Sequence, residues 1–107
     1  MEEYEMIIFE IINHGGTAKS LAYEALEFVE NGNYKEADNL LKEADKSLLA
    51  AHKVQTSLIQ SEAAGKHHEV SLLMVHAQDH LMTAIEAKSL IEKMILIYKK
   101  IDGIKEN

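Results

Sequence analysis

The chain has 107 residues, no cysteine and a formal net charge of -7, and 47% of its residues are hydrophobic. This length and composition predict one folded domain that spans residues 1–107. The acidic balance argues against a nucleic-acid partner, because phosphates require a basic surface. No apolar run reaches the roughly 18 residues of a membrane span, and the start MEEYEM lacks the basic flank of a signal peptide. We therefore expect a cytoplasmic protein without direct membrane insertion.

Every basic residue of the chain is a lysine. Without arginine, the protein lacks the planar guanidinium group that binds phosphates through bidentate hydrogen bonds and that acts as an arginine finger in nucleotide hydrolysis. No GxxxxGK[ST] loop is present either. The sequence therefore disfavours nucleotide hydrolysis.

Proline is absent, and β-branched residues do not alternate with polar ones over any useful length, so the pattern predicts an all-α protein. We expect helices over residues 5–30, 34–61 and 70–101, folded as an antiparallel three-helix bundle. In the first helix, spacings of three and four predict a buried stripe of Ile8, Ile11, Gly15, Ala18, Ala22, Ala25 and Val29. Its small residues favour close helix packing at Gly15 and Gly16, with a local kink as the competing interpretation.

The segment NGNYKEA, residues 31–37, predicts a tight turn between the first two helices. Gly32 has the position of a left-handed residue after the helix end, and Asn33 that of an N-cap, with Glu36 three residues later. The second helix should bury Ala37, Leu41, Ala44, Leu48, Ala51, Gln55 and Leu58. The polar connection SEAAGKHHEV, with Gly65 as its pivot, then predicts an exposed loop.

The third helix carries two candidate buried stripes. One would complete the bundle core and consists of Val70, Leu73, Ala77, Leu81, Ala84, Ile91, Ile95 and Tyr98. The other lies on the far side and consists of Leu72, Val75, Asp79, Met82 and Glu86. In a monomer, this second apolar face would lie exposed to solvent. The stripe therefore suggests self-association around a symmetry axis.

Self-association would bring the copies of Asp79 together at the axis. Crowded carboxylates must take up protons or share a cation, and oxygen ligands favour magnesium or calcium. The other interpretation is a solvated surface aspartate, and position alone slightly favours it.

Of the six histidines, His67 and His68 fall in the polar loop and are expected to be solvated, whereas His14 and His52 are expected to be partly buried and hydrogen-bonded. His76 and His80 lie four residues apart on one helical face, with His80 bordering the core. His76 lies at the edge between the core and the second stripe, where a neutral imidazole can attack phosphorus. An edge histidine without chemistry is the commoner case.

Three segments, VSLLMVHAQDHLMTA, GGTAKSLAYEAL and AHKVQTSLI, together resemble the IIA component of the lactose/cellobiose/diacetylchitobiose class of the bacterial sugar phosphotransferase system. The resemblance covers nearly the whole chain, and HAQDHLMTA is its most specific part. It implies a phosphotransferase that accepts a phosphoryl group from the phosphocarrier protein HPr on a histidine and passes it to a cysteine of the IIB component for sugar uptake.

The family's phosphorylated histidine matches His76, and its metal-binding aspartate matches Asp79. The resemblance thus implies a homotrimer with the third helix near the axis and one divalent cation, Mg²⁺, per trimer. Gln78 and His80 belong to the same segment, without an assigned role. Two alternatives remain open at this stage: a non-enzymatic helical protein-interaction module, and a histidine/carboxylate metal protein with chemistry of its own.

Overall fold

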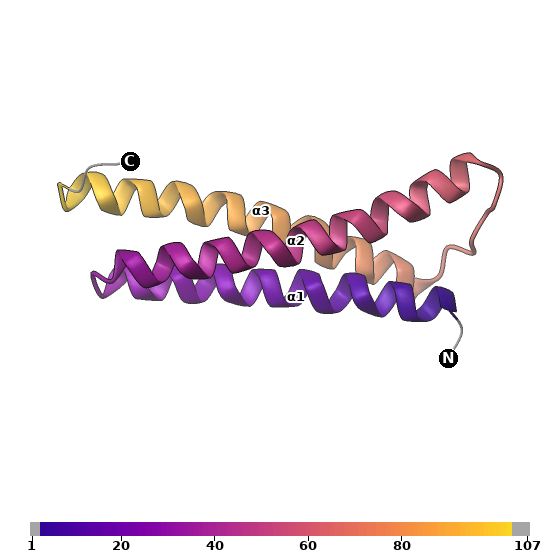
Figure 1. Cartoon of the computed structure of the whole chain (residues 1–107), viewed down its shortest axis with the longest axis horizontal. Helices are drawn as coiled ribbons and strands as arrows, with labels where there is room; N and C mark the ends of the chain where they lie inside the picture. The colour runs from indigo at the N-terminus through magenta and orange to yellow at the C-terminus, as the bar shows by residue number, and fades with distance from the viewer. Residues whose placement is uncertain (1–2, 104–107) are drawn as a thin grey trace.

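The computed structural model describes residues 3–103 and contains three long helices: α1 (Glu3–Glu30), α2 (Tyr34–Ala63) and α3 (Leu72–Ile101). Successive helices run in opposite directions in an elongated body of 53 × 24 × 18 Å (Figure 1). The predicted all-α, antiparallel three-helix architecture is confirmed, and its helix ends lie within two residues of the predicted ones.

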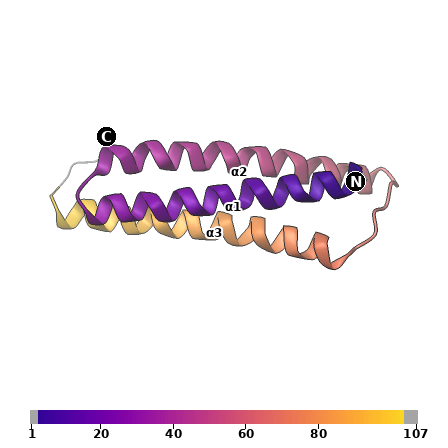
Figure 2. The same cartoon turned by 90° about the horizontal axis from the view of Figure 1, so that it is seen from below.

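The first helix organises the bundle. α1 packs along both α2 and α3, whereas α2 and α3 make few contacts with each other. The C-terminal half of α2 diverges from α3, and the connection of residues 64–71 joins their separated ends (Figures 1 and 2). None of the helices within the described residues is apolar over a long enough stretch to cross a membrane.

The core follows the predicted stripes closely in α1 and less closely elsewhere. All seven predicted positions of α1 are buried. In α2, Leu40 is buried in place of the predicted Leu41. The predicted positions Leu41, Leu48 and Gln55 are only half-buried. In α3, Val70 was predicted wrongly, because it precedes the helix and is 77% exposed.

The connections are fixed by local hydrogen bonds. Gly32 adopts φ 80°, and the side chain of Asn33 accepts a hydrogen bond from the backbone N–H of Glu36 at 3.2 Å, as the turn pattern predicted. Gly65 also has positive φ. At the start of α3, Ser71 is the N-cap, since its hydroxyl oxygen accepts from the N–H of Met74 at 3.1 Å. This cap starts α3 at Leu72 and leaves Val70 outside.

A charged residue interrupts the core of α3. Lys88 is only 8% exposed and lies on the buried stripe between Ala84 and Ile91. Its ammonium group pairs with Asp45 of α2 and, at 3.1 Å, with Glu92 one turn further along α3. The helical spacing did not predict that a lysine is buried here with two partly exposed carboxylates as partners.

The end of the bundle near the α1–α2 turn is closed by Tyr34, whose hydroxyl donates a hydrogen bond to Asp102. This bond, with smaller effects of burial and of the neighbouring charge, raises the pKa of Tyr34 to about 12. Because the folded pKa lies above the ordinary value of 10, the stability from this bond is complete below pH 10 and is lost as the pH rises through about 12.

We expect the alkaline absorbance titration of the protein to contain one tyrosine with a midpoint near 12. This step should be missing from Tyr34→Phe and should move toward lower pH in Asp102→Ala, which removes the acceptor. A Tyr34 step near pH 10 in the unmodified protein would contradict the hydrogen bond.

Candidate functional site

Two histidines lie together near the beginning of α3. The rings of His76 and His80 are stacked with centroids 5.5 Å apart and an interplanar angle of 21°. His76 is exposed and His80 is half-buried. The predicted placement of the pair on one helical face is therefore confirmed, and His76 is the member that another protein can reach.

The backbone that carries His76 is anchored on its inner side. Ala77 and Leu81 are fully buried against α1 and α2, and the Ser71 cap lies just over one turn before His76. A side chain on a capped and packed helix is presented with a defined direction, as a reaction with strict geometry requires.

His80 lies against the glycine pair of α1. A Cβ atom on Gly16 would come within 3.2 Å of the His80 Nε2 atom, and a Cβ on Gly15 would meet the backbone of His80 and Leu81 at 3.5 Å. α1 and α3 therefore approach closely at the two glycines, as predicted, and α1 continues as a helix through both of them.

The opposite flank of α3 is tied to α2 by Gln78. Its side-chain oxygen accepts a hydrogen bond from Gln55, and its amide nitrogen lies 3.9 Å from the sulfur of Met74. Because α2 and α3 otherwise make few contacts, this bond helps to fix the position of α3 near His76. Gln78 therefore has a structural role that its position in the sequence did not reveal.

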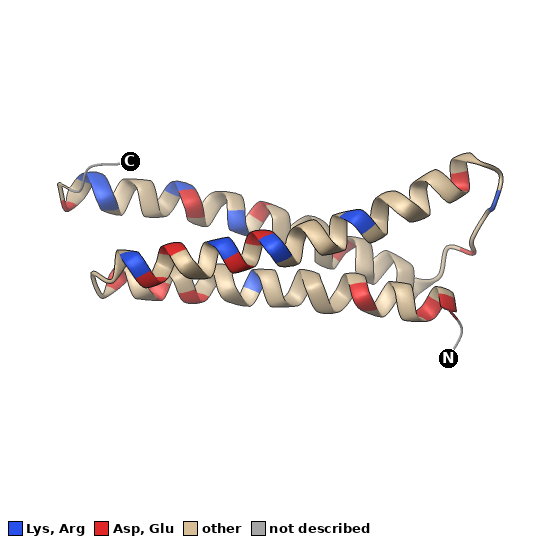
Figure 3. Cartoon of the chain, viewed as in Figure 1, with Lys and Arg blue, Asp and Glu red and all other residues tan. Residues whose placement is uncertain are grey.

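The second stripe of α3 lies on the outer surface of the chain. Leu72, Val75, Asp79, Met82 and Glu86 are all exposed. The apolar face also continues beyond the predicted positions through Leu90, Met94, Ile97 and Ile101, which are 44–75% exposed. Between Leu72 and Ala87, α3 carries no lysine, and its ribbon is largely uncharged there (Figure 3). Asp79 is thus a carboxylate within an apolar face.

The remaining histidines differ from the predictions in two cases. His14 is half-buried as expected, but His52 is exposed on α2. His67 is exposed, whereas His68 is half-buried because its ring stacks on Tyr4 with centroids 4.4 Å apart. Within residues 3–103, no three histidine, aspartate or glutamate side chains of one chain form a group that could hold a metal ion.

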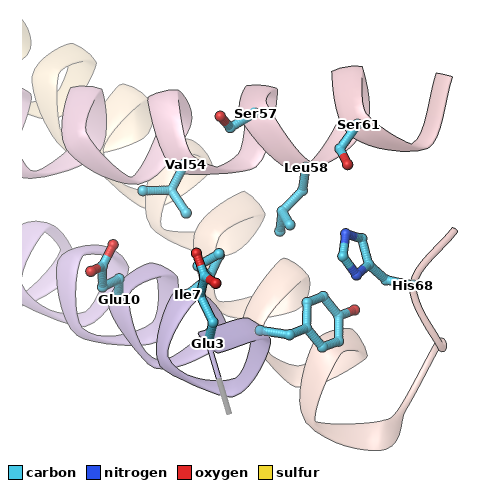
Figure 4. A pocket seen from close by; sticks show the side chains of 9 residues that line it. Glu3, Ile7, Glu10, Val54, Ser57, Leu58, Ser61 and His68 are labelled. Carbon is cyan, nitrogen blue, oxygen red and sulfur yellow. The ribbon is translucent and has the colours of Figure 1, made fainter. Parts of the chain in front are cut away.

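A pocket of about 510 Å³ lies at the other end of the molecule from the α1–α2 turn, between the beginning of α1 and the C-terminal part of α2 (Figure 4). Ile7, Val54 and Leu58 form its apolar wall, and Glu3 and Glu10 are among its polar lining. It includes neither His76 nor Asp79. The pocket is therefore separate from the stacked histidines.

The sequence model described as "PTS system, Lactose/Cellobiose specific IIA subunit" matches residues 6–99. The chain belongs to this family. The lichenan-specific phosphotransferase enzyme IIA component of Bacillus subtilis is 49% identical over 94% of this chain and 91% of its own length.

Solved structures of the family have the same fold. The crystal structure of the cellobiose-specific enzyme IIA from Bacillus anthracis superposes with a TM-score of 0.93 at 46% identity, covering 96% of this chain and 94% of that one. The IIA(Chitobiose) chain in a solution structure of its complex with HPr, from Escherichia coli, gives a TM-score of 0.82 at 38% identity, covering 95% and 99%.

These findings confirm the resemblance that HAQDHLMTA indicated, and with it the class of phosphotransfer proteins of sugar phosphotransferase systems. The three relatives are named for lichenan, cellobiose and chitobiose, respectively. Since different sugars accompany the same fold, family membership alone does not identify the sugar.

Proposed function

We propose that the chain is a cytoplasmic phosphocarrier that accepts a phosphoryl group from HPr on His76 and passes it to a IIB component for uptake of a sugar of the lactose, cellobiose or chitobiose class. The observation that carries the proposal is the exposed His76 ring, stacked on His80 in the segment that gives the family resemblance. The HPr complex of the Escherichia coli relative supports the choice of donor. Family membership favours this function over an interaction module without chemistry.

The first transfer needs few protein groups. A ring nitrogen of neutral His76 attacks phosphorus in line, and the bond from phosphorus to the donor's ring nitrogen breaks with its electron pair left on that nitrogen. The donor ring enters with phosphorus on one nitrogen and hydrogen on the other, and leaves as neutral imidazole. His76 ends with phosphorus on one nitrogen and hydrogen on the other. Protons and charge therefore balance without a separate acid or base.

In the second transfer, a cysteine thiolate of the IIB component attacks the phosphorus, the nitrogen–phosphorus bond breaks, and His76 returns to neutral imidazole. Both steps depend mainly on alignment of the two partners. A site without arginine suits this exchange, because bidentate hydrogen bonds from an arginine would bind the phosphoryl group tightly and hinder its release.

The proposal is tested by incubating the protein with phosphoenolpyruvate, enzyme I and HPr and measuring acid-labile phosphate. Label should reach one phosphoryl group per chain and should require HPr. Omitting HPr distinguishes phosphocarrier transfer from nonspecific labelling. A protein that stays unlabelled in the complete mixture would overturn the proposed function.

We also propose that three copies associate through the outer face of α3. The support is an apolar surface along most of that helix, in which Leu72, Met82 and Ile97 are more than half exposed. Exposed apolar surface of this extent is typical of an interaction face. A coiled-coil arrangement of three α3 helices would bury the stripe along the axis.

The proposed trimer would hold one divalent cation, Mg²⁺, at Asp79. The donor set fits, because each chain supplies a hard carboxylate oxygen from the same exposed position of α3 and water can complete an octahedral shell. A cation there would neutralise carboxylates that otherwise repel one another at the axis. The role of Asp79 would thus be assembly, and that of His76 phosphoryl transfer.

Replacing Asp79 by leucine is expected to tighten the trimer in a chelator, since apolar packing replaces repelling carboxylates. Sedimentation equilibrium should show a lower trimer dissociation constant for Asp79→Leu and a trimer that no longer responds to Mg²⁺. Asp38→Leu, an equivalent change at an exposed site on α2, serves as the control. A weaker Asp79→Leu trimer would count against the axial carboxylate, and a monomer under all conditions would exclude the trimer.

A further inference from the structure

The His80 ring lies between Gly16 of α1 and the ring of His76, the proposed phosphoryl acceptor. A Cβ on Gly16 would lie 3.2 Å from His80 Nε2 and 4.0 Å from both Cδ2 and Cε1. The first distance is shorter than an ordinary van der Waals contact, so the His80 ring occupies the space that a side chain on α1 would need. With alanine at position 16, the His80 ring would have to move by a few tenths of an ångström.

The His80 ring in turn restricts His76. The two rings face each other with an interplanar angle of 21°, and His76 is otherwise exposed to solvent. Exposed side chains change rotamer within picoseconds to nanoseconds, whereas a stacked ring has fewer available orientations. The backbone of α1 at Gly16, the His80 ring and the His76 ring thus lie next to one another in that order.

We propose that Gly16 is a positioning residue for phosphoryl transfer: by lacking a side chain, it lets the His80 ring lie against α1 and hold the His76 ring in the orientation for in-line attack. This inference rests on the proposed role of His76 as phosphoryl acceptor. Its physical basis is the steep dependence of in-line transfer on the direction of the attacking atom.

The neighbouring glycine provides a matched control. A Cβ on Gly15 would meet the backbone O of His80 and Cα of Leu81 at 3.5 Å, which is ordinary contact. Alanine at either position favours the helix relative to glycine, so neither variant should lose stability through helix propensity. Only Gly16→Ala pushes against the imidazole ring.

The test measures single-turnover transfer from phosphorylated HPr to the full chain. We expect Gly16→Ala to slow transfer about tenfold, because displacement of a reacting ring by well under 1 Å is already costly, whereas Gly15→Ala should keep a rate close to that of the unmodified protein. Thermal unfolding should show both variants as stable as the parent. Nitrogen-detected NMR of the His76 ring should change in Gly16→Ala and remain unchanged in Gly15→Ala.

A double-mutant cycle establishes whether Gly16 acts through His80. His80→Ala removes the ring and should slow transfer, and adding Gly16→Ala to it should have no further effect. Equal rates for the two glycine variants, or a Gly16→Ala effect that persists without His80, would overturn the inference. Absence of label in the unmodified protein would instead overturn the proposed function, so the two failures are distinct.

Discussion

Replacing His76 by alanine is expected to reduce labelling from phosphoenolpyruvate, enzyme I and HPr to background. The substitution removes the proposed acceptor nitrogen, and the half-buried His80, whose ring lies beside Gly16 of α1, does not take over the exposed position of His76. The far-ultraviolet spectrum and thermal stability should remain close to those of the unmodified protein, because His76 is not part of the core.

His52→Ala is the matched control for this variant. His52 is also an exposed histidine on a helix, but it lies on α2 and outside the stacked pair. It should accept label at the same rate and to the same extent as the unmodified protein. Equal labelling of His76→Ala would show that another residue accepts the phosphoryl group.

The double variant Asp45→Ala/Glu92→Ala is expected to lose about 2–3 kcal/mol of unfolding free energy, because it leaves the ammonium of Lys88 in the core without a partner. The Lys88 side chain is 11% exposed, whereas those of Asp45 and Glu92 are 60% and 47% exposed. The loss of unfolding free energy therefore comes mainly from the ammonium group of Lys88, which is left unpaired in the core. Its flexible stem can move the ammonium toward water, which places the loss below that of a deeply buried pair.

The pKa of Lys88 agrees with this description. Burial, the largest single effect, lowers its pKa, but the hydrogen bonds to Asp45 and Glu92 and the negative charges of these carboxylates together outweigh burial, so the pKa lies above the ordinary value of 10.5. The lysine is therefore charged in both folded and unfolded chains at neutral pH. Stability from its raised pKa is complete below pH 10.5 and is lost as the pH rises through the folded value.

Lys88→Met should be as stable as the parent or slightly more stable, because an apolar side chain of similar length replaces a buried charge while both carboxylates remain in water. Asp38→Ala/Glu43→Ala changes the net charge equally at exposed sites on α2 and should have little effect. Urea unfolding at one fixed protein concentration measures all four proteins, since association would shift apparent stability. A Lys88→Met protein that loses as much as the double variant would contradict the argument.

Helical periodicity was sufficient for the fold. In α1, spacings of three and four identified all seven buried residues, because this helix packs along its length against both α2 and α3. The stripe was less reliable in α2, where Leu40 is buried rather than Leu41. Because α2 contacts mainly α1, it has one narrow interface, and the spacing alone does not determine which of the adjacent Leu40 and Leu41 lies in it.

Contacts that depend on the relative placement of helices and loops were not predictable from spacing. Lys88 has a position that continues the stripe of α3 from Ala84 to Ile91, but its burial requires Asp45 to face it from α2. The sequence did contain a signal for this ion pair: a lysine in an otherwise regular apolar stripe, followed by a glutamate four residues later. The stacking of His68 on Tyr4 joins a loop to a helix far away in the sequence, so helical periodicity could not predict it.

At the candidate site, the sequence predicted the neighbouring histidines and the location of the second stripe away from the bundle core, since both follow from the geometry of one helix. It did not predict that the His80 ring lies beside Gly16, because that neighbourhood requires the register between α1 and α3. The trimer and its cation at Asp79 stay predictions.

The most direct test of the account locates the phosphoryl group and follows its departure. The protein is labelled through HPr, digested under alkaline conditions that preserve phosphohistidine, and sequenced by tandem mass spectrometry before and after addition of a IIB component. We expect one phosphoryl group on His76 and its loss when IIB is added. A phosphoryl group on a different residue, or one that stays on His76 in the presence of IIB proteins of the whole lactose, cellobiose and chitobiose class, would contradict it.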